Sequence, residues 1–86
     1  MFKTSDLYLA AFLKTAGVVL TGASLQEGGR PKVLFEFEDP GGTILRDLKD
    51  EFFLDRAKIN ALSYSQNIRL LKILLHQTLS QKGETL

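Results

Sequence analysis

The segment of residues 32–38 constrains the fold of this chain most strongly, because its hydrophobicity alternates residue by residue. Val33, Phe35 and Phe37 share one face of an extended strand, and the residues between them share the other. A second run rich in β-forming residues, 18–25, precedes this segment across a glycine-rich turn. Together the two runs predict an antiparallel hairpin. Because an isolated hairpin is marginal in water, its phenylalanine face must be covered by other parts of the chain.

Three stretches with apolar residues at helical spacing predict the elements that cover this face. They are residues 5–16, 43–54 and 64–79. Ser63 opens a capping-box pattern, which predicts the start of the last helix. Residues 58–61 are open to two interpretations, a short third strand of the sheet or a loop.

The predicted order is helix, strand, strand, helix, a short strand or loop, and helix. This order is typical of an α+β fold, here an antiparallel hairpin covered on one face by three helices. The 86 residues suffice for one domain, which we assign to residues 1–80, with 81–86 as a frayed tail. A domain this small buries only about 60% of its unfolded surface. Since no cysteine is present to form disulfides, we expect that a second copy completes the fold.

The location of the protein is predicted from two features of the sequence. A chain without cysteine fits a reducing compartment. The apolar run of residues 7–13 is too short to span a bilayer, which needs about 20 residues, and it lacks the pattern of a secretion signal. We therefore expect a cytoplasmic protein that does not enter membranes.

The inventory of reactive side chains argues against an enzyme. The absence of cysteine excludes thiol catalysis and thiolate metal sites, and the single histidine, His76, excludes a site with several histidine ligands. Neither glycine pair matches a phosphate-binding loop, and the acidic residues match no calcium loop. We therefore expect a protein without catalytic residues, metal, cofactor or small-molecule substrate.

Charge is divided between two neighbouring segments. Residues 36–55 hold seven acidic and two basic residues, whereas residues 56–83 hold five basic residues and no acidic one. On a helical wheel, three of the groups in the second segment share one flank of the last predicted helix, and two more lie upstream in the connector. These five candidate partner-binding residues are Arg69, Lys72, His76, Lys58 and Arg56.

The same wheel shows an apolar arc roughly 180° wide, whereas one core contact requires only about 100°. Two interpretations follow. In the first, the helix packs against both the sheet and the first helix and is buried on most sides. In the second, part of the arc packs inside the domain and the rest contacts a partner.

Two functions are compatible with this pattern. The first is a protein–protein interaction module that forms a homodimer, in which the basic flank of one copy meets the acidic second helix of its neighbour. The alternative is a nucleic-acid-binding accessory protein that uses the same basic flank. The second function has weaker support, because five cations make a small footprint and no known recognition motif is present.

The chain also resembles a family of short bacterial and phage proteins. The resemblance begins with the pattern F-x-T-S-D-x-x-L-A-A-F-L in residues 2–13 and continues through Gly17, residues 33–37 and residues 67–72. It implies a small stand-alone domain carried by mobile elements, and it implies no activity, because none is assigned to the family. It also places Arg69 and Lys72 in a recurring part of the pattern.

Overall fold

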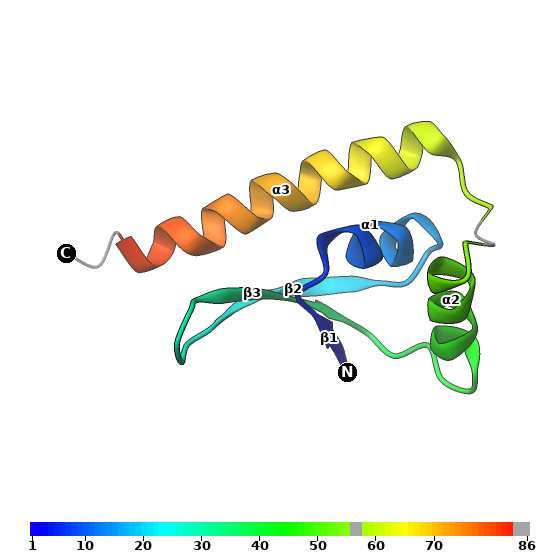
Figure 1. The fold of residues 1–86 in the computed structure, drawn as a ribbon, viewed down its shortest axis with the longest axis horizontal. Coiled ribbons are helices and arrows are strands. Elements are labelled where there is room, and N and C mark those ends of the chain that lie inside the picture. The colour runs from blue at the N-terminus through cyan, green and yellow to red at the C-terminus, as the bar shows by residue number, and fades with distance from the viewer. Residues whose placement is uncertain (56–57, 84–86) are drawn as a thin grey trace.

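The computed structural model describes residues 1–55 and 58–83, and side chains as far as residue 80. Three strands and three helices form one α+β domain, with extents of 44 × 27 × 20 Å (Figure 1). In chain order the elements are β1 (Phe2–Thr4), α1 (Leu7–Thr15), β2 (Leu20–Gln26), β3 (Lys32–Phe37), α2 (Ile44–Phe53) and α3 (Ala61–Gly83). The predicted α+β class, the antiparallel hairpin and the presence of three helices are therefore confirmed, but the predicted order is wrong, because the chain begins with a strand before α1.

The sheet is antiparallel and has the order β1-β3-β2. The central strand β3 places Phe35 opposite Ala23 of β2 and Phe37 opposite Phe2 of β1. On the other face, the Lys3 ammonium lies 3.4 Å from a carboxylate oxygen of Glu36. The strand that joins the hairpin of β2 and β3 to form a three-stranded sheet is therefore β1, at the start of the chain.

The interpretation of residues 58–61 as a third strand is wrong. Residues 58–60 form no strand, and Ala61 already belongs to α3. The side-chain oxygen of Asn60 accepts a hydrogen bond of 2.9 Å from the Ser63 amide, which is the geometry of a helix N-cap. The prediction that Ser63 caps this helix is therefore also wrong, because Asn60 does so three residues earlier. At its other end, the backbone of α3 stays helical through Gly83, beyond the start of the predicted tail.

The helix α1 begins at Leu7, two residues later than the predicted start at residue 5, because Asp6 is its N-cap. One carboxylate oxygen of Asp6 accepts hydrogen bonds from the amides of Tyr8 and Leu9, at 3.0 and 3.1 Å. These bonds satisfy two of the amides that a helix leaves without partners at its N-terminus. Gly17, with a φ of 97°, follows the last turn and reverses the chain toward β2.

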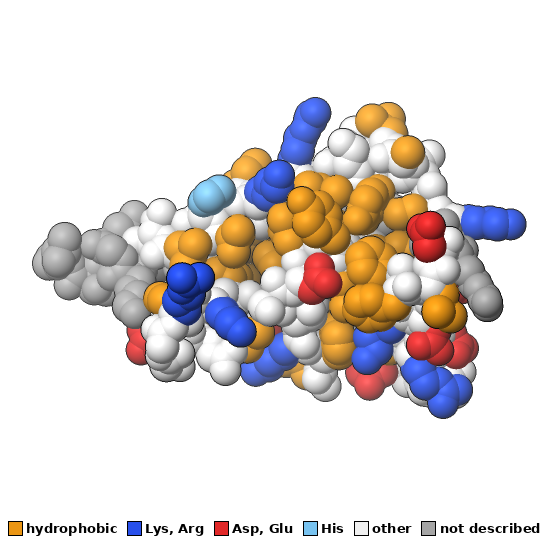
Figure 2. All heavy atoms as spheres, in the orientation of Figure 1, with side chains coloured by type: hydrophobic (Ala, Val, Ile, Leu, Met, Phe, Trp, Pro, Cys, Tyr) orange, Lys and Arg blue, Asp and Glu red, His pale blue; other side chains and the backbone are white. Residues whose placement is uncertain are grey.

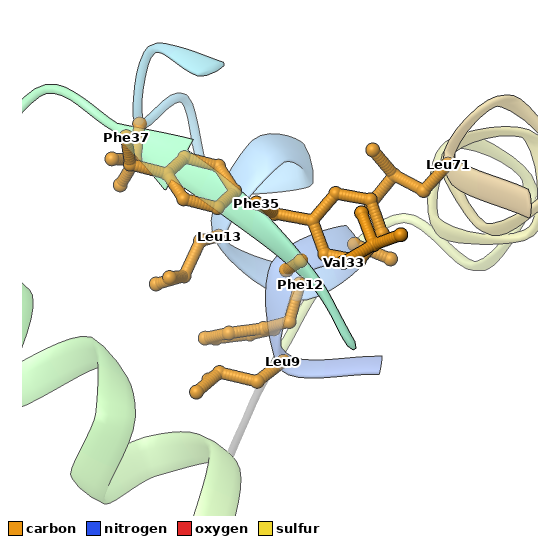
Figure 3. Packing of buried hydrophobic residues seen from close by; sticks show 10 residues of the cluster. Leu9, Phe12, Leu13, Val33, Phe35, Phe37 and Leu71 are labelled. Carbon is orange, nitrogen blue, oxygen red and sulfur yellow. The ribbon is translucent and has the colours of Figure 1, made fainter. Parts of the chain in front are cut away.

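The core lies between the sheet and the helices α1 and α3 (Figure 1). Its largest fully buried side chains are Phe12, Leu13, Phe35, Phe37 and Leu71. Figure 3 shows Phe35 of the central strand pointing toward Leu71 of α3, while α1 supplies the side chains on the opposite flank. The alternation that predicted β3 therefore corresponds to the buried face of the sheet.

The prediction that all three helices cover the sheet is wrong for α2. This helix packs beside α1, where the rings of Phe52 and Phe12 lie 5.5 Å apart between centroids. The Lys49 ammonium lies 5.0 Å from the centroid of the Phe2 ring. Because α2 closes one end of the core, it uses a narrow inner stripe and leaves its other sides in solvent.

Candidate functional site

One side of α3 is held by the domain. The Tyr64 hydroxyl donates to the backbone carbonyl of Tyr8 at 3.4 Å, and the Asn67 side-chain amide donates to the Thr15 hydroxyl at 3.0 Å. One turn further on, Leu71 is buried against the hairpin. These contacts with α1 and the sheet fix the rotation of the helix, and so they decide which of its side chains face solvent.

The opposite side of α3 forms what we call the α3 outer face. Three of its large apolar side chains are between 53% and 67% exposed. Its cationic residues and the histidine are also exposed, and they make no hydrogen bond or ion pair with any residue that the structure describes. The α3 outer face consists of Leu62, Arg69, Leu70, Lys72, Ile73 and His76.

The wide apolar arc is divided between the core and solvent. Tyr64, Ile68 and Leu71 pack against the core. Leu70, at the edge of the arc, is exposed, so the helix is not buried on most sides as the first interpretation requires. Ile73 lies outside the arc and is also exposed. Contact of the exposed part with a partner, which the second interpretation requires, stays a prediction.

The five candidate residues predicted from the sequence do not form one cluster. Arg69, Lys72 and His76 share the α3 outer face, so their predicted grouping on one flank agrees with the structure. Lys58 is exposed in the connector before α3. The nearest of the three in sequence is Arg69, which lies more than two helical turns into α3. Arg56 lies outside the described residues.

A second exposed face, which we call the α2 outer face, lies on the helix whose acidic character the sequence predicted, but its exposed apolar residues were not predicted. Its three large apolar side chains are between 51% and 65% exposed, and three acidic residues and Arg46 are exposed beside them. This face consists of Ile44, Arg46, Asp47, Asp50, Glu51, Phe53 and Leu54. A helical wheel of α2 contains the signal, because these residues lie off the inner stripe of Leu45, Leu48 and Phe52. Figure 2 shows hydrophobic side chains gathered over α3 and toward α2, and acidic side chains toward the α2 end.

A hollow of about 380 Å³ lies between α1, α2 and the start of α3. Phe12, Leu48 and Ile59 provide its apolar lining. The Thr15 hydroxyl in its wall donates to the Ala11 carbonyl at 2.7 Å and accepts from Asn67, so it already serves the packing of helices. We therefore place the candidate site on the two outer faces and not in this hollow.

No group of three or more histidine, cysteine, aspartate or glutamate side chains among the described residues is arranged to hold a metal ion. Among the same residues, no helix combines the length and apolar character that crossing a membrane requires.

The pKa of Tyr64 lies above its ordinary value of 10.0. The main cause is burial, which disfavours the tyrosinate, and the negative charges of Asp6 and of ionised Tyr8 add to it. A raised pKa in the folded state means that folding favours the neutral hydroxyl, which is the form that donates to Tyr8.

We expect the free energy of unfolding to fall as the pH rises above about 10. The contribution of Tyr64 is complete below the pKa of the unfolded chain and is lost as the pH rises through the higher folded pKa. Urea unfolding at several pH values between about 9 and about 11 would measure this loss, which should be smaller in Tyr64→Phe than in the wild type. An equal loss in both proteins would contradict the assignment to Tyr64.

Comparisons with protein-family models, with curated proteins and with solved structures found no match for this chain. The resemblance to short bacterial and phage proteins therefore stays a prediction. Function is inferred below from the two outer faces.

Proposed function

We propose that this chain is a non-enzymatic protein–protein interaction module that self-associates through the α3 outer face. The supporting observation is that large apolar side chains on this face stand more than half exposed beside cations without partners among the described residues. Full burial of a leucine or isoleucine side chain contributes about 1.5–3 kcal/mol, so a partner that covers this face gains from each of them. Contiguous exposed apolar surface in a small domain marks an interaction site.

A second copy is the partner that the chain itself provides. The segment of residues 36–55 is acidic, so each molecule carries charges of the sign that the α3 outer face lacks. A small domain also gains relatively more from association than a large one, because its own core is limited. Association of like copies thus satisfies both the apolar and the basic residues of this face.

Nucleic-acid binding is the second candidate. One observation favours it, namely that no acidic residue lies in α3, from Ala61 to Gly83. Phosphates would neutralise Arg69 and Lys72, and affinity would fall steeply with salt. However, Leu70 and Ile73 stand exposed among these cations and gain nothing from a phosphate backbone. We therefore favour a protein partner.

Reversing the charges on α3 separates the two functions. We expect the double variant Arg69→Glu with Lys72→Glu to fold and to lose the dimer at tens of micromolar, as measured by size exclusion with light scattering. Filter binding of single- and double-stranded DNA and RNA at low salt, with the wild type and the variant, tests the second function. If the wild type is a monomer that retains a nucleic acid specifically, and the variant does not retain it, the result would support nucleic-acid binding instead.

The matched control is Arg30→Glu with Lys32→Glu, in the exposed turn and the first residue of β3. It exchanges the same two residue types and changes the net charge equally. We expect it to remain dimeric. If both double variants lose the dimer to the same degree, total charge and not the α3 outer face governs association.

A further inference from the structure

We propose that the α2 outer face of a second copy covers the α3 outer face, and that two copies make this contact reciprocally around a two-fold axis. This inference rests on the proposed self-association and names the surface that takes part in it. Its first support is that the apolar parts of the two faces are similar in length. Leu62 and Ile73 on α3 are separated by about 16 Å along the helix axis, and Ile44 and Phe53 on α2 by about 14 Å, at 1.5 Å per residue.

The apolar residues of the two faces are of the kind that anchor an interface. Phe53 and Leu54 stand at the end of α2 with more than half of their side-chain surface in solvent. The Phe53 ring packs edge-on against Phe52, at 5.2 Å between centroids. An exposed aromatic ring is suited to be buried by a partner, because a phenylalanine side chain has only two torsions and so loses little entropy when it binds.

The net charges of the two faces are opposite, because Asp47, Asp50 and Glu51 outnumber Arg46 on α2, whereas the charged residues of the α3 outer face are basic. Among the described residues, Asp50 and Glu51 on α2 make no ion pair, and neither do Arg69 and Lys72 on α3. Within one molecule the two sets are thus not used to stabilise each other. Between two molecules they can pair, which speeds association and fixes the register of the contact.

The charges also disfavour the simplest alternative, in which the α3 outer faces of two copies pack against each other. That arrangement would bring the cations of one α3 close to those of the other, and like charges brought together at an interface oppose association. A contact between α3 and the neighbouring α2 avoids this repulsion and neutralises both sets.

Reciprocity follows because every copy carries both faces. In a two-fold dimer, α3 of the first copy contacts α2 of the second, and α2 of the first contacts α3 of the second. A standard interface needs about 800 Å² per partner. That is about one seventh of the domain surface of 5888 Å².

A mixing experiment tests this inference. The acidic variant is Arg69→Glu with Lys72→Glu, and the basic variant is Asp50→Lys with Glu51→Lys. Alone, each variant presents two faces of like charge to its own copies, so we expect both to be monomeric at tens of micromolar. In an equimolar mixture the α3 face of each variant meets an α2 face of opposite charge, and we expect light scattering to recover the dimer mass of the wild type.

The outcomes separate this inference from the proposed function. If the wild type is dimeric and the acidic variant monomeric, but the mixture stays monomeric, α2 is not the partner surface and self-association through α3 still stands. A basic variant that remains dimeric on its own overturns the inference in the same way. A monomeric wild type overturns the proposed function itself.

Discussion

Replacing Phe35 with alanine is expected to lower the free energy of unfolding by roughly 3–5 kcal/mol. The Phe35 side chain is fully buried, at 0% exposure, in the central strand of the sheet. It lies between Ala23 of the neighbouring strand and Leu71 of α3, so its removal leaves a cavity that no single element can fill. Because a domain of this size is stable by only about 4–13 kcal/mol, the substitution removes a large share of the total stability. Urea unfolding followed by circular dichroism measures the effect.

The variant Phe53→Ala provides a matched control, since it removes the same ring from a position that is 65% exposed. At concentrations where the chain is monomeric, we expect it to cost less than about 1 kcal/mol. Equal losses for Phe35→Ala and Phe53→Ala would mean that β3 does not form the centre of the core.

Replacing Ile73 with aspartate is expected to raise the dissociation constant of the dimer at least about 30-fold, which corresponds to about 2 kcal/mol. The side chain contacts solvent and not the core, so the fold should be retained. In the dimer, the new carboxylate would be buried in an apolar contact and would face the acidic residues of the neighbouring α2. Sedimentation velocity over a range of concentrations measures the change.

Val19→Asp is the corresponding control, because Val19 and Ile73 are both 55% exposed and both β-branched. Val19 lies between α1 and β2 and belongs to neither outer face. The substitution Val19→Asp should leave the dissociation constant of the dimer unchanged within about twofold. A dimer that tolerates Ile73→Asp as well as it tolerates Val19→Asp would exclude α3 from the interface.

Much of this fold could be predicted because its signals are local. The alternation of Val33, Phe35 and Phe37 depends only on the geometry of a strand, and it identified β3 within one residue. The same is true of the apolar spacing that identified the three helices. The strand β1 gave no such signal, because three residues are too few for a period to appear. Phe2 is placed by its pairing with Phe37, a contact that only the folded chain creates.

The candidate site was predictable in part for the same reason. Arg69, Lys72 and His76 lie within two turns of one helix. The helical wheel therefore places them on one flank, independently of how the other elements pack. Lys58 belongs to a connector, and its position depends on how α2 and α3 pack. The exposure of Phe53 was predictable in the same way, because the wheel of α2 places it off the stripe that contains Phe52, whose ring packs beside Phe12.

The mass of the wild-type protein in solution tests the central claim most directly. Sedimentation equilibrium at tens of micromolar, at low and at moderate salt, should give twice the mass of the chain at low salt, and weaker association as added salt screens the charges. A single species with the mass of one chain under both conditions would contradict self-association and leave the α3 outer face without the partner proposed for it.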